Sequence, residues 1–239
     1  MNKTKIDWAD FVWNPITGCK TGCWYCYARR MYKRFGRSFE PAFHPEKMDQ
    51  LRSFHPQYSP SKVFVCSVSD LFGPWVKKEW RDQVLEEIAK PRYLNMGVNF
   101  LLLTKWPQEI KLEPQENVWV GVTITNQDDY SKLRTLNKNY AGHKYISFEP
   151  LLGGIEIAPT DDFALAQIGW AIVGKLTGPT KAPWEDKWAQ DLVEALRERH
   201  IPTFLKDNLN WPEDKRKVWA QYPYQLLPPF PSNYNSSRR

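Results

Sequence analysis

The sequence predicts an α/β protein built on a parallel (β/α) barrel, partial or complete, of about six to seven strands in the TIM-like manner. Short apolar runs, rich in β-branched and aromatic residues, recur along the chain. Their nearly continuous apolarity is typical of strands buried on both faces of a parallel sheet. Amphipathic segments separate the runs, and this repetition predicts right-handed βα units. An open, doubly wound sheet is the alternative.

The elements can be placed in order along the chain. A first strand is expected within 10–18, and the apolar runs that follow are 63–69, 99–104, 118–125, 144–152, 168–174 and 201–206. Apolar side chains repeat at helical spacing between some of these runs. They are Trp80, Val84, Leu85 and Ile88; Tyr130, Leu133 and Leu136; and Ala189, Leu192, Val193 and Leu196.

We expect one domain over residues 1–222, with a long insertion loop at 38–62 that could contact substrate. Residues 223–239 are rich in Pro, Ser and Asn and predict an extended tail. The N-terminus has no apolar run behind its charges, and no stretch is long enough to span a bilayer. A soluble, cytoplasmic protein without membrane contact is therefore expected.

The composition suits a polyanionic partner without requiring one. Lys and Arg number 33 against 27 Asp and Glu, which gives a net charge of +6, and aromatic residues make up 15% of the chain. Several of the basic residues follow the cysteines in "ARRMYKRFGR". A solvated face of the first helix is the simpler interpretation of these charges, and phosphate binding is the alternative.

Three of the four cysteines, Cys19, Cys23 and Cys26, lie within eight residues of one another. Neighbouring thiols on one loop pair poorly as disulfides, so a metal or cluster is the better interpretation. A structural zinc ion needs four ligands, and completing it would require Cys66 or His44. Three thiolates instead suit a [4Fe–4S] cluster whose fourth iron stays open for chemistry.

The stretch Cys19-Lys-Thr-Gly-Cys23-Trp-Tyr-Cys26 resembles the signature of the radical S-adenosylmethionine (SAM) superfamily, with Tyr25 as the aromatic residue before the last cysteine. A narrower resemblance is to a small phage-associated family of radical-SAM-like proteins of unassigned substrate. The blocks that carry it are "WNPITGC", "VFVCSVSDLFG", "LLLTKWP", "NVWVGVTITN", "ISFEPLLGGI" and "IVGKLTGP".

The resemblance implies an enzyme that binds a [4Fe–4S] cluster through the three cysteines and SAM at the open iron. An electron from a flavodoxin- or ferredoxin-like donor would then cleave SAM reductively to a 5′-deoxyadenosyl radical, which abstracts hydrogen from a substrate. A nucleic acid or nucleotide is the first candidate substrate, and a small metabolite or peptide the alternative. The non-catalytic alternative is a zinc-bearing nucleic-acid-binding module.

Polar residues at the carboxyl ends of the predicted strands are the further candidates, because the active face of a parallel barrel lies there. Those expected to contact SAM, some of them by the resemblance alone, are Tyr25, Ser67, Ser69, Asp70, Lys105, Thr123, Thr125, Asn126 and Glu149. Capping of a turn is the alternative for Asp70, and a buried ion pair is the alternative for Glu149. Lys105, Glu149 and Lys206 are the candidates for a catalytic role.

Overall fold

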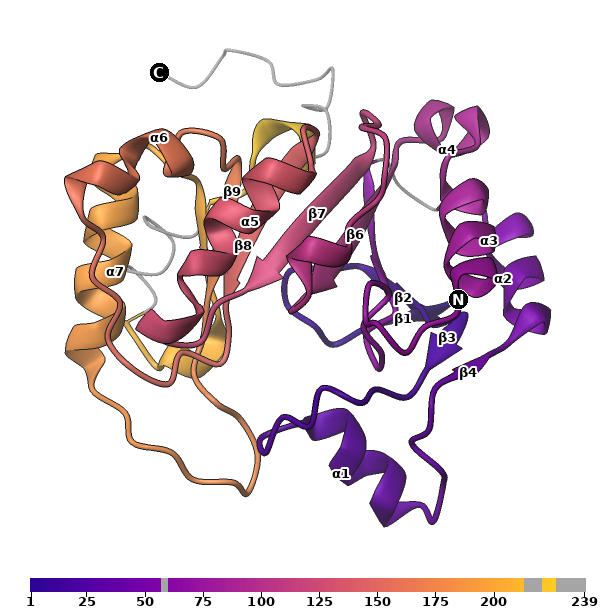
Figure 1. Cartoon of the computed structure of the whole chain (residues 1–239), viewed down its shortest axis with the longest axis horizontal. Helices are drawn as coiled ribbons and strands as arrows, with labels where there is room; N and C mark the ends of the chain where they lie inside the picture. Colours follow the sequence, from indigo (N-terminus) through magenta and orange to yellow (C-terminus); the bar gives the residue numbers. More distant parts are fainter. Residues whose placement is uncertain (57–59, 213–220, 227–239) are drawn as a thin grey trace, which may run out of the picture.

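The computed structural model describes residues 1–56, 60–212 and 221–226. Its main feature is an eight-stranded sheet in which seven parallel strands follow one another in chain order (Figure 1). These are β2 (Phe11–Trp13), β5 (Ser61–Val65), β6 (Val98–Thr104), β7 (Val118–Thr123), β8 (His143–Phe148), β9 (Trp170–Val173) and β10 (Thr203–Leu205). The antiparallel strand β1 (Asn2–Lys3) borders β2, and β3 (Ile16–Thr17) pairs with β4 (Ala42–Phe43) in a small second sheet.

The predicted α/β fold with a mainly parallel sheet is therefore confirmed, and each predicted strand is present. Closure into a complete barrel is not observed among the described residues, because β1 and β10 lie at opposite edges of the sheet and do not pair. The strand order also runs without the reversal that a doubly wound sheet requires. The sheet is open and wound in one direction.

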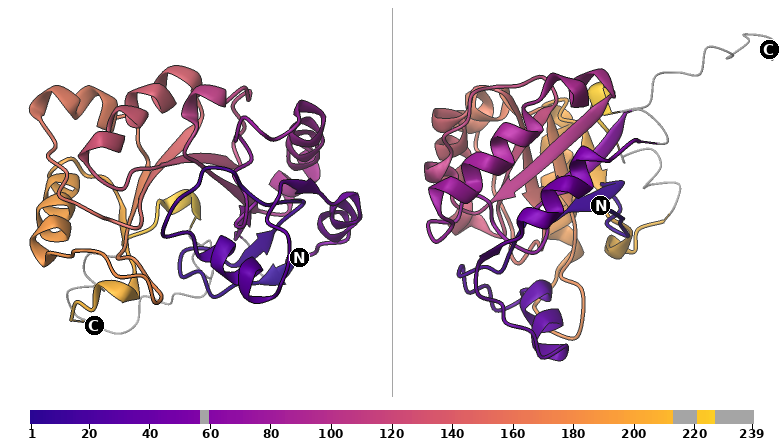
Figure 2. Two further views of the ribbon diagram at one scale, coloured as in Figure 1. Left: turned by 60° about the horizontal axis from the view of Figure 1, so that its bottom comes forward. Right: turned by 90° about the vertical axis from the view of Figure 1, so that its right-hand side faces the viewer.

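The helical stripes of the sequence correspond to three of the seven α-helices in the described part of the chain. The helices are α1 (Tyr27–Arg34), α2 (Met48–Arg52), α3 (Lys78–Ile88), α4 (Pro91–Asn95), α5 (Ser131–Asn139), α6 (Asp162–Leu165) and α7 (Asp186–Glu198). The predicted stripes lie on α3, α5 and α7, whose apolar residues are buried in one cluster with the sheet. Helix α1 lies apart from this layer (Figures 1 and 2).

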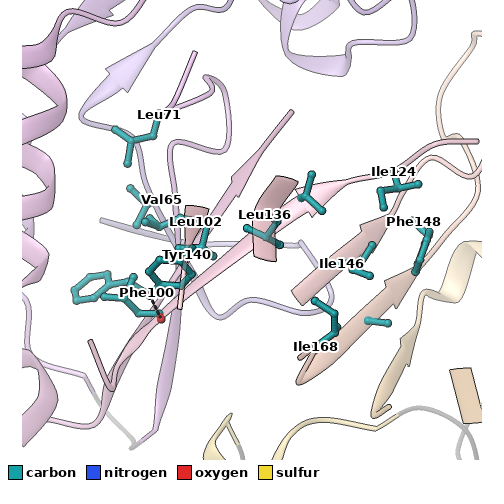
Figure 3. Packing of buried hydrophobic residues seen from close by; sticks show 14 of the residues in the cluster. Val65, Leu71, Phe100, Leu102, Ile124, Leu136, Tyr140, Ile146, Phe148 and Ile168 are labelled. Atoms are coloured by element: carbon teal, nitrogen blue, oxygen red, sulfur yellow. Dashed lines mark hydrogen bonds between the residues drawn. The ribbon is translucent and has the colours of Figure 1, made fainter. Parts of the chain in front are cut away.

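Alternate residues along the strands point to opposite faces of the sheet, as strand geometry requires. On β6, Phe100 and Leu102 belong to the cluster beneath the helices, whereas Leu101 between them belongs to a second cluster. The first cluster extends across β5 to β9 and includes Ile146 and Phe148 (Figure 3). Both faces are apolar because both are covered.

Aromatic residues dominate the second face, which the two ends of the chain cover. Trp8 packs there against Phe64, and Leu226 is fully buried in the same cluster. The Trp170 indole donates to the backbone oxygen of Gln221 at 3.1 Å. The predicted tail, 223–239, thus begins within this covering segment, and its residues 227–239 lie outside the described part of the chain.

The segment predicted as an insertion loop, 38–62, contains more structure than expected. It includes β4, a 3₁₀ turn at Pro45–Lys47 and helix α2, whose Met48 and Leu51 are buried in the main core. The expectation of a simple loop was wrong because two apolar residues three positions apart suffice to anchor one helical turn. Residues 57–59 lie outside the described part of the chain.

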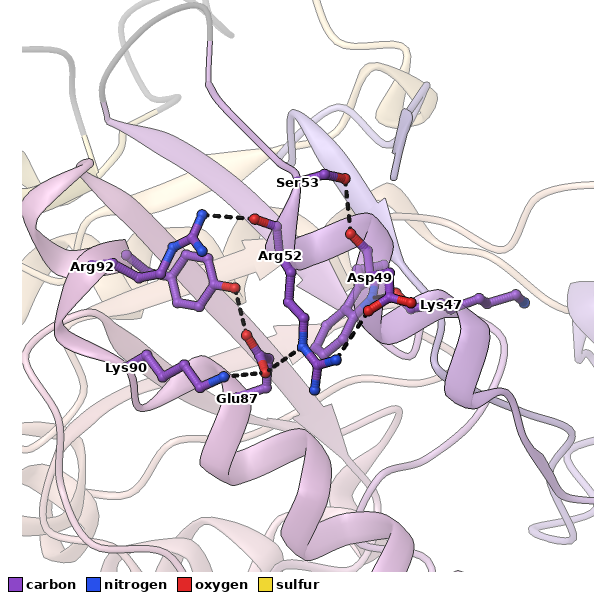
Figure 4. Close-up of polar contacts among 9 residues, drawn as sticks. Lys47, Asp49, Arg52, Ser53, Glu87, Lys90 and Arg92 are labelled. Atoms are coloured by element: carbon purple, nitrogen blue, oxygen red, sulfur yellow. Dashed lines mark hydrogen bonds and ion pairs between the residues drawn. The ribbon is translucent and has the colours of Figure 1, made fainter.

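A buried carboxylate joins α2, α3 and α4 at one edge of the sheet (Figure 4). Glu87 is 2% exposed and accepts hydrogen bonds from Lys90 Nζ at 2.6 Å, Tyr93 Oη at 2.7 Å and Arg52 Nε at 3.2 Å. Burial acts to raise the pKa of Glu87, but these donors outweigh it and hold the pKa below its ordinary value.

Replacement of this carboxylate provides a test of the network. Because the folded-state pKa of Glu87 is lowered, the carboxylate stabilises the fold at neutral pH, and this contribution is lost as pH falls below about 4.5. We expect Glu87→Gln to lower the free energy of unfolding by about 2 kcal/mol at pH 7 and by less at pH 4. Urea denaturation at both pH values measures this, and Glu86→Gln, at an exposed position of the same helix, is the matched control. Equal losses of stability at the two pH values would contradict a lowered pKa for Glu87 in the folded protein.

Candidate functional site

The loop that carries the three cysteines is fixed to the sheet at its first residues. Gly18 forms an isolated parallel bridge with Ser69, just beyond the end of β5. The Gly18 amide donates to the Val68 oxygen at 3.2 Å, and the Ser69 hydroxyl donates to the Gly18 oxygen at 2.6 Å. These bonds hold the start of the loop at the carboxyl edge of the sheet.

Only glycine fits at position 18. Its φ is +81°, and a Cβ placed there would lie 2.3 Å from the backbone oxygen of Glu40. The amide of Cys19 also donates to the Phe39 oxygen at 3.3 Å. The loop therefore runs directly against the backbone of residues 39–40, an approach that a side chain would prevent.

A cavity of about 730 Å³ lies beside this loop. Cys19, Cys23 and Cys26 all line it, and all three are free, half-buried thiols. Among the described lining residues there is no histidine and no fourth cysteine. The volume is within the usual range of small-molecule sites.

Short contacts order the thiols within the loop. Cys19 Sγ lies 3.2 Å from the Thr21 hydroxyl, and burial raises the pKa of the Cys19 thiol. Cys26 caps α1, where its Sγ accepts a hydrogen bond from the Arg29 amide at 3.4 Å. The Arg29 guanidinium reaches back to the Cys19 oxygen at 2.7 Å, which ties the two ends of the loop together.

Among the described residues, the three thiols are not placed to hold one metal ion. A tetrahedral zinc ion draws its sulfur ligands to about 2.3 Å from one centre. In the described chain, no three His, Cys, Asp or Glu side chains are placed to hold such an ion.

The proposed fourth zinc ligands are not available at this site. Cys66 is 2% exposed, does not line the cavity, and has a pKa raised to about 12 by burial. The His44 ring instead lies 2.8 Å from the Thr17 hydroxyl through Nε2. Neither residue lines the cavity, so the structure does not bring a fourth zinc ligand from Cys66 or His44 to the three thiols.

Tyr25 and Lys105 face each other at the cysteine end of the cavity. Both line it, and the Lys105 ammonium lies 5.6 Å from the centre of the Tyr25 ring. Burial lowers the pKa of Lys105 despite the nearby Cys23 thiol, and burial raises the pKa of Tyr25. Lys105 forms no ion pair with a carboxylate of the described residues, so its ammonium is available to an anionic ligand.

Asp70 lines the same cavity but is committed to the protein. Its carboxylate accepts hydrogen bonds from the Thr104 hydroxyl at 2.7 Å, the Lys105 amide at 2.9 Å and the Phe72 amide at 3.2 Å. Burial raises its pKa against the effect of these donors. The alternative interpretation of Asp70, as a residue that caps a turn, therefore describes its contacts. By accepting from the Lys105 amide, Asp70 also fixes the backbone that carries the Lys105 side chain.

The other predicted contact residues fall into two groups. Ser67, Ser69 and Thr123 line the cavity, although Ser67 Oγ already donates to Asn14 Oδ1 at 3.1 Å. Thr125 and Asn126 do not line it. The Thr125 hydroxyl donates to Asp129 at 2.7 Å, and Asn126 caps the following turn. The structure therefore does not bring these two residues to the cavity, because β7 ends at Thr123 and the chain turns away after it.

Glu149 and Lys206 meet in the cavity, just beyond the ends of β8 and β10. Glu149 Oε1 accepts a hydrogen bond from Lys206 Nζ at 2.5 Å, and both residues line the cavity. The side chains are 22% and 14% exposed, so this ion pair is only partly screened by water. The ion pair that was the alternative interpretation of Glu149 is observed, and its predicted contact with SAM stays a prediction.

Several lining residues were not among the predicted site residues. The cavity also includes Lys3 and Lys5 near β1, and Lys175 and Thr177 from the loop after β9. Arg30 holds that loop, because its guanidinium donates to Thr180 Oγ1 at 2.5 Å and to the Tyr25 oxygen at 3.0 Å. The contact with Thr180 joins residues 150 positions apart, which no local pattern could indicate.

The chain can now be compared with known proteins. A family model described as "Protein of unknown function (DUF5131)" matches residues 3–227. The chain belongs to this family. It is also 30% identical over 131 residues to an uncharacterized protein of Methanocaldococcus jannaschii, MJ0683, a match that covers 53% of this chain and 48% of that protein. The chain thus spans about half the length of this relative. No solved structure matches at a significant level.

These findings correct the family expected from the cysteine motif. The matching family is DUF5131, whose function is unknown, and neither match is to the radical SAM superfamily or to the phage-associated radical-SAM-like family. A motif of eight residues indicates which side chains could bind a cofactor, but it does not identify the protein family. Unrelated chains can carry a short loop with the same chemistry. Any function for this DUF5131 protein therefore has to be argued from its site.

Among the described residues, no helix combines the length and apolarity needed to cross a membrane.

The position of the cysteine loop can be tested at Gly18. Gly18→Ala places a methyl group against the Glu40 backbone, whereas Gly36→Ala, at φ +62°, meets nothing within 4 Å. The second variant pays only for the left-handed backbone, about 1 kcal/mol. We expect Gly18→Ala to lower the free energy of unfolding in urea by at least about 2 kcal/mol more than Gly36→Ala. Equal losses would contradict the close backbone approach.

Proposed function

We propose that this DUF5131 protein is an enzyme in which Cys19, Cys23 and Cys26 hold a [4Fe–4S] cluster whose fourth iron binds SAM. The observation that carries the proposal is the donor set: three half-buried free thiols share one cavity, and its described lining offers no fourth cysteine or histidine. A structural metal site would be closed by four protein ligands. Three thiolates leave one position for a small ligand.

The sheet supports the same proposal. Its strands run in chain order, which is the arrangement of a partial (β/α) barrel, and the cavity lies at their carboxyl ends. When bound, the cluster would supply one electron, received from a flavodoxin- or ferredoxin-like donor, to break a carbon–sulfur bond of SAM and release methionine and a 5′-deoxyadenosyl radical that takes a hydrogen atom from the substrate.

The chain's own residues would bind and orient the reactants. Lys105 presents an unpaired ammonium close to the cysteine loop, suited to the carboxylate of the methionyl group. The apolar side chains of Trp8, Phe64 and Leu103 line the cavity and would exclude water from a reactive intermediate. Glu149 and Lys206 would place polar groups against the substrate in the same cavity.

The cluster assignment predicts the effect of removing one ligand. We expect Cys23→Ala, purified without oxygen, to lose the iron and sulfide that the wild type holds at about four each per chain. Cys66→Ala should retain them, because Cys66 is buried away from the cavity. Iron and sulfide analysis measures this, together with formation of 5′-deoxyadenosine from SAM and dithionite. A colourless wild type that binds one zinc ion would instead support the non-catalytic zinc module.

Lys105 provides a separate test of SAM binding. We expect Lys105→Met, which keeps the length of the side chain but removes its charge, to weaken SAM binding about tenfold. Equilibrium dialysis of the iron-loaded protein measures the dissociation constant. Lys111→Met, at an exposed position of the loop after β6, is the matched control. Unchanged affinity in Lys105→Met would remove this residue from the SAM site.

A further inference from the structure

The surface beside the cavity carries an unusual arrangement of charge. Five cations lie within residues 27–37, on α1 and the turn that follows, and this stretch contains no Asp or Glu. No member forms an ion pair with a carboxylate of the described residues. Exposed helices normally intersperse the two signs, because like charges repel along a helix face. A solvated face alone does not account for the absence of every acidic partner.

Aromatic rings are exposed among these cations. Phe35 is 63% exposed and Tyr27 is 51% exposed, although apolar rings are normally buried. The guanidinium groups of Arg34 and Arg37 lie 6.0 Å and 5.9 Å from the centre of the Phe35 ring. We call the exposed residues Tyr27, Arg29, Lys33, Arg34, Phe35 and Arg37 the α1 patch.

The α1 patch continues into the cavity. Tyr27 and Met31, one helical turn apart, both line the cavity, and so does Phe39, over whose ring the Arg29 guanidinium lies at 5.0 Å. Helix α1 also projects away from the helix layer, so that its outer side is open to a large ligand (Figures 1 and 2). A ligand on this surface therefore has direct access to the cavity.

The charges of the cavity have the same sign as those of the α1 patch. Its lining includes the lysines Lys3, Lys5, Lys105, Lys175 and Lys206, and the carboxyl groups Asp70 and Glu149. Asp70 is satisfied by the backbone and Thr104, and Glu149 is paired with Lys206. Lys175 is paired with Asp186 at 3.3 Å, so Lys3, Lys5 and Lys105 supply the excess. The cavity and its rim thus present an excess of positive charge, which attracts a phosphorylated ligand.

From these features we propose that the substrate of the enzyme is a single-stranded nucleic acid, bound along the α1 patch with one base entering the cavity. The proposal rests on the proposed function, because the cavity is taken to be the reaction site. Cations contact phosphates, and exposed rings stack on unpaired bases, which is how proteins hold single strands without sequence preference. A base in a duplex would first have to leave its stack to reach the cavity.

Binding of labelled oligonucleotides tests the surface directly. Fluorescence anisotropy with mixed-sequence strands of about 12 nucleotides, one of DNA and one of RNA, gives the dissociation constants over a range of salt. We expect the triple variant Lys33→Gln, Arg34→Gln, Arg37→Gln to bind at least tenfold more weakly than the wild type. The slope of log affinity against log salt should fall by about 2, because three phosphate contacts are lost. The strand that binds more tightly identifies the sugar.

Matched controls separate the α1 patch from net charge. A second triple variant removes the same number of exposed positive charges elsewhere and should change binding less than twofold. Its substitutions are Lys111→Gln, Lys138→Gln and Lys187→Gln. Phe35→Ala, at a position too exposed to affect the core, should weaken binding at least fivefold through lost stacking. No binding by the wild type, equal losses in the two triple variants, or tighter binding of a duplex would overturn the proposal.

Two further measurements separate this inference from its alternatives. Iron content and 5′-deoxyadenosine formation are measured on the same preparations, so strand binding by a protein that never assembles a cluster would contradict the proposed function while leaving the surface assignment supported. An acidic electron-transfer protein is the other occupant that the charge would fit. If the α1 triple variant keeps strand binding but loses reduction by reduced flavodoxin, the nucleic-acid proposal is overturned.

Discussion

The site depends on a backbone bridge between Gly18 and Ser69. This bridge, with the Ser69 hydroxyl on the Gly18 oxygen, fixes the start of the cysteine loop to the end of β5. Because Gly18 also runs against the backbone of residues 39–40, the loop is held from two sides. The thiols can then open into the cavity without contributing to the hydrophobic core. Packing in the core therefore does not fix the positions of the three thiols.

The parallel sheet brings the remaining lining residues to this loop. Five residues lie at or beyond the ends of five different strands, and all line one cavity because parallel strands end at a common edge. They are Asp70, Lys105, Thr123, Glu149 and Lys206. Their roles nevertheless differ. The carboxyl group of Asp70 accepts hydrogen bonds from backbone amides, and that of Glu149 is paired with Lys206. Lys105 has no carboxylate partner among the described residues. This division leaves a cavity with free positive charge and few free acceptors.

Helix α1 lies beside the thiols because it directly follows the cysteine loop in the chain. The helix begins at Tyr27, and the sulfur of Cys26 caps its first turn. The basic and aromatic residues of the α1 patch are therefore held next to the thiols by the chain itself. Arg30 then joins this helix to the loop after β9, at Thr180. The loop, the helix and the far segment therefore form one rim around the cavity. A ligand that contacts the rim is placed to reach the thiols.

The sequence by itself determined the strands, the three long helices and the donor set. Strand and helix periodicities are local, and the cysteines lie within one loop, so neither needs knowledge of the fold. Only the tertiary structure decided that Thr125 and Asn126 turn away from the cavity, that Cys66 is buried, that the sheet stays open, and that Lys175 and Arg30 belong to the site. Those outcomes depend on where strands end and on contacts between distant segments, which the order of residues along the chain does not display.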